Sequence, residues 1–231
     1  MCKDNVSEIL RMFQGVFILM VEYKKYDSFF EKEVLKIFTD AFFKYPLFYG
    51  AFEDVIKDEA KLYSLYETIM KAIFKATIRK NECIIGMVDG KVASIVIVQK
   101  PTDKPISVWD YVVSGMPKVL VKLGIKKTFE YLDFTDHTED VVKSIKEPRW
   151  HLYFLAVDPS RHHEGLGTDA IQNYVIPLVK KNDGKLITVN TNAEKNVEFY
   201  QKNGFSIVEK DIHKFYGNTV NNWTFRMDLK D

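Results

Sequence analysis

The order of strand-like and helix-like segments after residue 150 constrains the fold of this chain most strongly. Two β-rich runs, 150–157 and 185–191, flank a helix predicted over 168–181. Such a crossover is right-handed and makes its two strands parallel. A helix over 193–202 follows, and then strands over 206–212 and 222–229 in an antiparallel hairpin through Gly217-Asn218. We predict an α/β protein with a mixed, mostly antiparallel central sheet, a locally parallel strand pair and flanking helices.

The preceding residues predict helices and one hairpin. Apolar spacing favours helices over 29–45, which would stop before Pro46, and over 60–77. Asp89-Gly90 joins strands over 82–88 and 91–99, because this pair readily takes the positive φ angles of a tight turn. Residues 107–129 are predicted to be mostly helical, with Pro117 kinking or dividing the helix, and 139–145 add a further turn. The apolar face expected on 107–129 consists of Trp109, Val112, Val113, Met116, Val119, Leu120 and Leu123.

Composition excludes several classes of function. The 33 basic and 32 acidic residues leave a net charge of +1, which argues against a nucleic-acid partner. Cys2 and Cys83 lack the spacing of a disulfide framework or a metal site, so we expect no metal and a reducing cytoplasm. The apolar run 16–21 is far shorter than the roughly 20 residues of a membrane span, and charged residues follow it at once. We expect a cytoplasmic monomer or homodimer without a membrane partner.

A glycine-containing loop connects the predicted strand 150–157 to the next helix. Gly165 and Gly167 let the backbone approach a ligand closely, and the first N–H groups of the helix suit a phosphate or diphosphate. The alternative is ordinary turn chemistry at a strand-to-helix junction. The P-loop pattern and the dinucleotide fingerprint are both absent from this loop.

At these residues the sequence resembles the GNAT superfamily of N-acetyltransferases, in which Val-x-Pro precedes Arg/Gln-x-x-Gly-x-Gly/Ala. Here the order is Val157-Asp158-Pro159 and then 162–167, with His162 in place of Arg or Gln and Arg161 beside it. A second stretch, 192–205, is similar to the family's Asn-containing helix that ends in Phe-Tyr-x-x-x-Gly-Phe. Residues 150–205 carry the close resemblance. No repeat or Gly/Ser/Pro-rich linker divides the chain, so we expect a single N-acetyltransferase domain over 1–231. A weaker resemblance, to the subgroup that includes puromycin N-acetyltransferase, implies a helical insertion at about 105–147.

The resemblance implies acetyl-CoA as co-substrate, without a metal. The strand 150–157 and its parallel neighbour would splay apart, and the pantetheine arm would bind the exposed backbone between them. Apolar character alone would indicate only a buried strand. The implied cofactor residues are Leu155, Ala156, Val157, His162, His163, Glu164, Gly165, Leu166, Gly167, Thr168, Asn192, Asn196 and Phe199. Asn192 is alternatively a helix N-cap, and Phe199 is expected to pack in the core.

Acyl transfer needs a neutral amine, a stabilised oxyanion and a proton for the thiolate. By resemblance, a backbone N–H near Leu155 stabilises the oxyanion and Tyr200 is the general acid; alternatively Tyr200 only packs its helix on the sheet. Alternation along the strand would put His151, Tyr153, Leu155 and Val157 on one face, which makes His151 the first candidate base. Its alternative is a structural or surface role. Glu147 and Glu53 are weaker candidates, and many family members use only a water chain.

The acceptor is expected to be a primary amine of a small molecule. An aromatic cluster could line its pocket or belong to the core; its members are Phe42, Phe43, Tyr45, Phe48, Tyr49 and Phe52. The predicted activity is transfer of an acetyl group from acetyl-CoA to this amine by direct attack in a ternary complex. The alternative is a non-catalytic acyl-CoA-binding sensor or scaffold.

Overall fold

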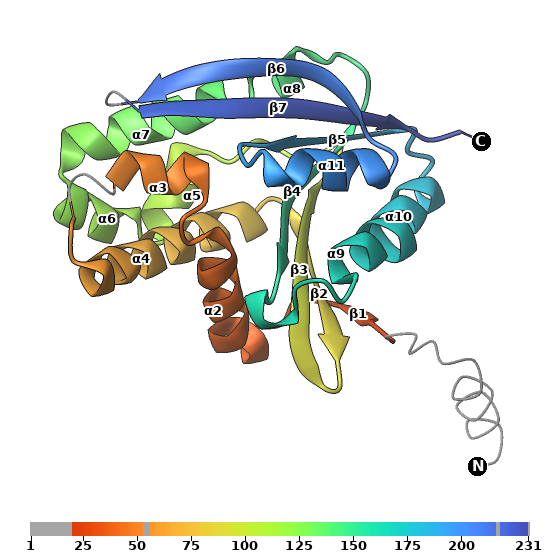
Figure 1. Ribbon diagram of the computed structural model, residues 1–231, viewed down its shortest axis with the longest axis horizontal. Coiled ribbons are helices and arrows are strands. Elements are labelled where there is room, and N and C mark those ends of the chain that lie inside the picture. Colours follow the sequence, from red (N-terminus) through yellow and green to blue (C-terminus); the bar gives the residue numbers. More distant parts are fainter. Residues whose placement is uncertain (1–19, 53–55, 216–217, 231) are drawn as a thin grey trace.

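The computed structural model of the chain describes residues 20–52, 56–215 and 218–230. They form a seven-stranded sheet in the order β1-β2-β3-β4-β5-β7-β6 (Figure 1). Neighbouring strands are antiparallel except β4 and β5, which are parallel, so the predicted mixed sheet is confirmed. The strands are β1 (Glu22–Lys25), β2 (Glu82–Val88), β3 (Lys91–Gln99), β4 (Trp150–Val157), β5 (Leu186–Thr191), β6 (Ser206–Phe215) and β7 (Asn218–Asp228).

Helices pack on both faces of the sheet, and a buried apolar cluster lies on each. The first cluster draws on α2 (Glu31–Phe42), α3 (Pro46–Phe52), α4 (Glu59–Ile78), α6 (Met116–Leu123) and α7 (Ile125–His137). The second draws on the π-helical turn Ala170–Val175, which continues α9 (Leu166–Asp169), and on α10 (Ile176–Lys181) and α11 (Lys195–Lys202). The remaining elements are α5 (Val108–Val113), α8 (Asp140–Ser144) and the 3-10 turns Ser28–Phe30 and Pro159–Arg161. No helix in the described part of the chain is long and apolar enough to cross a membrane.

The β2–β3 hairpin has the predicted bounds and turn. Asp89 and Gly90 have φ angles of 51° and 75°, as a tight two-residue turn with positive φ at both positions requires. Strand β1 was not predicted. Only four residues long and rich in charge, it lies at the edge of the sheet beside β2, where a solvated strand carries little apolar alternation.

The helical stretch after residue 107 breaks at a different place from the one expected. Ser114 ends α5, and Gly115, with φ of 108°, begins α6, so Pro117 lies in the first turn of α6 instead of dividing a helix. Proline is well tolerated there because its missing N–H needs no partner. The predicted apolar face is therefore wrong in part: Met116 and Val119 are buried, whereas Trp109, Val112 and Val113 are exposed.

Candidate active site

Strands β4 and β5 separate after a short parallel contact. The pairing joins Trp150 to Ile187 and His151 to Thr188, and β5 then continues along β7 as far as Thr191. From Leu152 onward β4 is paired with β3 alone among the described strands. The backbone edge of β4 that faces β5 is therefore open, and an extended ligand can bind there as an added strand would.

A β-bulge lies in the middle of β4 and reverses its alternation. Leu152 pairs with Val98 and Phe154 with the adjacent Ile97, which leaves Tyr153 as the extra residue. The predicted common face for His151, Tyr153, Leu155 and Val157 is therefore wrong. Tyr153 packs with the first apolar cluster, whereas Leu155 packs with the second and Val157 with Leu166. The bulge shifts the pleat by one residue, and nothing in the strand's composition reveals it.

The glycine loop turns directly into the helical segment 166–181. Gly165 has a φ of 80°, and its carbonyl accepts the first helical hydrogen bond from the N–H of Asp169, at 2.9 Å. The N–H groups of the three preceding residues, Leu166, Gly167 and Thr168, come before that bond and have no acceptor within the helix. They carry the positive end of the helix dipole, which suits a diphosphate.

Two contacts hold this loop against its neighbours. A Cβ added at Gly167 would lie 3.0 Å from Cζ of Phe199, so glycine lets α9 approach α11 closely. The Thr168 hydroxyl accepts a hydrogen bond from Nδ2 of Asn203 at 3.3 Å. The half-buried Phe199 packs against the second apolar cluster and thereby links the loop to the core.

The polar side chains of the loop bind one another. Arg161 Nε donates to Glu164 Oε2 at 2.9 Å, so the cationic side chain beside His162 is paired within the loop. His162 and His163 are both exposed, and His163 has a φ of 71°. The Arg161 side chain is therefore already paired, whereas the backbone N–H groups of residues 166–168 have no acceptor within the helix.

A polar cluster lies at the open end of β5. The Tyr45 hydroxyl is 2.9 Å from Oγ1 of Thr191 and accepts from the backbone N–H of Asn192 at 2.7 Å. Asn196 Nδ2 donates to the same Thr191 oxygen at 3.1 Å. The Asn192 side chain instead donates to the Asn221 carbonyl at 3.1 Å, so the alternative that it caps α11 is wrong.

Tyr200 lies on α11 and is buried with its ring near Phe205 and Phe225. It also lines the cavity described below. Burial, and then the nearby Tyr45, raise the pKa of Tyr200 well above its ordinary value. The phenol therefore keeps its proton at neutral pH, as a general acid must.

His151 is buried beside β5, with Nδ1 3.0 Å from the Thr188 hydroxyl. Burial, reinforced by the charge of Arg149, lowers the pKa of His151 to about 3. An imidazole with such a pKa is a poor proton acceptor at neutral pH, which weighs against His151 as the general base. The weaker candidate Glu147 lies at an exposed position near Arg226, and Glu53 lies outside the described residues.

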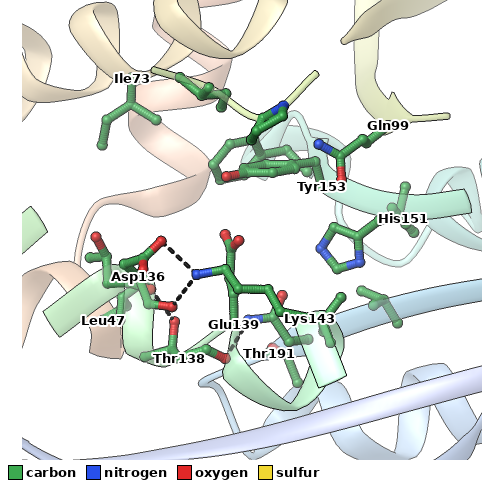
Figure 2. A pocket seen from close by; sticks show the side chains of 18 of the residues that line it. Leu47, Ile73, Gln99, Asp136, Thr138, Glu139, Lys143, His151, Tyr153 and Thr191 are labelled. Carbon is green, nitrogen blue, oxygen red and sulfur yellow. Dashed lines mark hydrogen bonds and ion pairs between the residues drawn. The ribbon is translucent and has the colours of Figure 1, made fainter. Parts of the chain in front are cut away.

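A cavity of about 1100 Å³ extends from the open strands to α5, α7 and α8 (Figure 2). Part of the aromatic cluster fulfils both expected roles: Phe42 and Phe48 belong to the core and also line this cavity. Phe43 packs instead against Tyr63 and Tyr66. The cavity thus joins the open edge of β4 to a chamber walled by the helices 108–144.

Glu139 projects into this chamber from the junction of α7 and α8, opposite Tyr153 and His151 (Figure 2). Burial raises the pKa of Glu139, and the nearby Tyr153 hydroxyl partly offsets that effect. Sequence reasoning did not single this residue out, because the segment carries no motif and its approach to β4 depends on tertiary packing. Among the described residues no cluster of three or more His, Cys, Asp or Glu side chains could hold a metal ion.

Known proteins are similar to this chain in part of its sequence and in its fold. Residues 135–220 match the family model described as acetyltransferase (GNAT) domain. In sequence alone, the chain has no significant match among curated proteins.

Solved structures share the fold across nearly the whole chain. A GCN5-related N-acetyltransferase of Rhodopseudomonas palustris aligns with a TM-score of 0.56 and 14% identity over 93% of this chain and 100% of its own. A polyamine N acetyltransferase of Drosophila melanogaster aligns with a TM-score of 0.54 and 14% identity over 91% and 100%. A Corynebacterium glutamicum protein described as a histone acetyltransferase and related acetyltransferase aligns with a TM-score of 0.60 and 13% identity over 91% of this chain and 98% of its own.

The sheet with one open parallel pair therefore has the acyl-CoA N-acyltransferase fold. The match of residues 135–220 to the GNAT family model confirms the predicted resemblance to the GNAT superfamily. The resemblance to puromycin N-acetyltransferase, and the single domain with an insertion at about 105–147, stay predictions.

Proposed function

We propose that this protein transfers an acetyl group from acetyl-CoA to a primary amine of a small molecule. One observation carries the proposal. The open edge of β4 connects a helix N-terminus that suits a diphosphate with a chamber that contains a protonated tyrosine, Tyr200. The GNAT family match supports the same activity.

The proposed cofactor path follows the open edge. The amides of Leu166, Gly167 and Thr168 bind the diphosphate, with His162, His163, Glu164 and Gly165 completing the loop around it. The backbone of Leu155, Ala156 and Val157 bonds the pantetheine arm, and Asn196 with Phe199 borders it from α11. The thioester then reaches the cavity beside Leu155 and Tyr200, which both line it.

The residues of the chain supply the groups that direct acyl transfer requires. The neutral amine attacks the thioester carbonyl carbon, and a backbone N–H near Leu155 stabilises the oxyanion. The adduct collapses by breaking the carbon–sulfur bond, and Tyr200 gives its proton to the departing thiolate. The nitrogen releases one proton, which replaces the proton that Tyr200 gave up, and it then carries the acetyl group as an amide while CoA leaves as the thiol.

The comparisons favour an amine acceptor. The Drosophila structure is described as a polyamine N acetyltransferase that forms N acetylagmatine. A concave chamber with several aromatic side chains in its walls fits a small amine better than a protein tail. We propose a cytoplasmic monomer or homodimer that has no nucleic-acid or membrane partner.

A thiol-release assay tests the proposal. Purified protein and acetyl-CoA are incubated with agmatine, 1,4-diaminobutane or 2-phenylethylamine, and free CoA thiol is followed with a thiol reagent. We expect amine-dependent release, with the acetylated amine appearing in equal amount by mass spectrometry. Binding of acetyl-CoA without transfer to any amine would instead favour the non-catalytic sensor or scaffold.

A further inference from the structure

Two cationic side chains lie near the Glu139 carboxylate, and both bind other groups. No ion pair of Glu139 with lysine, arginine or histidine occurs within the part of the chain that the structure describes. Lys143, which bears on its pKa, binds Asp136 at 2.5 Å, and Arg149 donates to the Ile145 carbonyl at 3.1 Å. A half-buried carboxylate that faces a cavity is costly unless a cation binds to it.

The position of Glu139 is fixed from the sheet. The carbonyl of its neighbour Thr138 accepts hydrogen bonds from Asn222 Nδ2 at 2.9 Å and from Asn190 Nδ2 at 3.3 Å. These amides come from β7 and β5, and β5 is the strand that diverges from β4. The junction of α7 and α8 is thereby anchored at the open strands, where the thioester is proposed to lie.

Two tyrosines share the chamber with this carboxylate. Tyr153, the bulge residue of β4, lies opposite Glu139 in the chamber (Figure 2). Tyr111 of α5 also lines the chamber, and burial together with the charge of Glu139 raises its pKa to about 12. The other titratable groups that bear on Glu139 are Asp136, Lys143 and Arg149, with His151 across the chamber (Figure 2).

We propose that Glu139, with Tyr153 and Tyr111, forms the site that receives the ammonium of the acceptor, and that Glu139 takes its proton. The inference rests on the proposed function. One ammonium proton passes to a Glu139 oxygen and leaves later to solvent. The neutral nitrogen then attacks the thioester carbon. The second proton is lost as the adduct collapses and replaces the one that Tyr200 gives to the thiolate.

The variant Glu139→Gln keeps the shape of the side chain and removes its charge. With the fastest amine of the panel, we expect kcat/KM to fall by about 10²-fold or more, the usual size of a general-base contribution. The wild-type kcat should fall as the pH drops through the Glu139 pKa, because the protonated carboxyl cannot accept a proton. The kcat of Glu139→Gln should not show this fall at low pH. Glu59→Gln, at an exposed position of α4 outside the cavity, should keep both kcat/KM and the pH dependence of the wild type.

Urea unfolding of Glu139→Gln distinguishes a catalytic role of Glu139 from a role in folding. Since burial raises the pKa of Glu139, the folded state favours the protonated form, and the carboxylate lowers stability once the pH exceeds the folded-state pKa. Glu139→Gln should therefore unfold in urea at no lower a concentration than the wild type at pH 8. Its affinity for CoA should also be unchanged.

The outcomes distinguish this inference from the proposed function. A wild type that acetylates no amine overturns both. A wild type that acetylates an amine, with Glu139→Gln equally fast and equally dependent on pH, overturns the Glu139 site alone. A Glu139→Gln variant that loses activity only because it unfolds earlier also contradicts the inference.

Discussion

In the proposed reaction the hydroxyl group of Tyr200 donates the proton to the departing thiolate. Its ring packs 5.6 Å from Phe205 and 5.5 Å from Phe225, between ring centroids, and these contacts survive replacement by phenylalanine. We therefore expect Tyr200→Phe to lower kcat by about 10²-fold while leaving the Kd for CoA unchanged, because only the proton donor is lost. Steady-state kinetics and calorimetry measure the two effects.

Tyr174→Phe is the matched control for this substitution. Tyr174 contacts Tyr23, with 4.9 Å between ring centroids, and does not line the cavity, so its hydroxyl should be dispensable for turnover. An unchanged kcat in Tyr200→Phe would rule out the tyrosine as the acid.

At the same scale, sequence patterns predicted residues with a motif and missed those without one. Gly165, Gly167 and Tyr200 belong to local patterns whose elements follow from the order of strands and helices. Glu139 belongs to none. Tyr45 was expected in an aromatic cluster, but its contact with Thr191, 146 residues away along the chain, was not predicted. Contacts of that kind depend on how the first helices pack over the sheet.

The junction of α7 and α8 is the element on which the acceptor chamber depends. Asn222 is fully buried, donates to the Thr138 carbonyl and accepts from Asn192 Nδ2 at 3.2 Å. Asn222→Ala leaves both partners less satisfied, so we expect the free energy of unfolding to fall by about 1–3 kcal/mol, measured by urea denaturation. The KM for the amine should rise more than the Kd for CoA, because the loosened junction carries the chamber wall.

Asn221→Ala is the control for that junction. It alters the adjacent β7 residue but keeps the backbone carbonyl to which Asn192 donates. If the two variants affected stability and amine KM equally, the anchoring role of Asn222 would be wrong.

Local periodicity predicted most elements but not the irregularities within them. The β2–β3 hairpin and the bounds of β4 follow from turn chemistry and β-rich composition. The bulge at Tyr153 and the break at Gly115 could not be predicted in this way. A bulge shifts the strand register by one residue but leaves the composition of the strand unchanged. The predicted face of β4 was wrong for that reason.

At the scale of the whole molecule, the proposed reaction site has two parts, the glycine loop and the chamber. The second apolar cluster supports the glycine loop, and the first supports the helices around the chamber, so the opening between β4 and β5 connects the two faces. The order of elements was sufficient to predict the first half. The chamber was not predictable, because its walls come from helices whose packing no sequence motif specifies.

Calorimetric titration of the wild-type protein with CoA tests the central claim most directly. The account predicts saturable, one-to-one heat with a Kd in the micromolar range, about −8 kcal/mol at 1 μM, from backbone amides at the start of α9 and along β4. The absence of any saturable heat at millimolar CoA would contradict it.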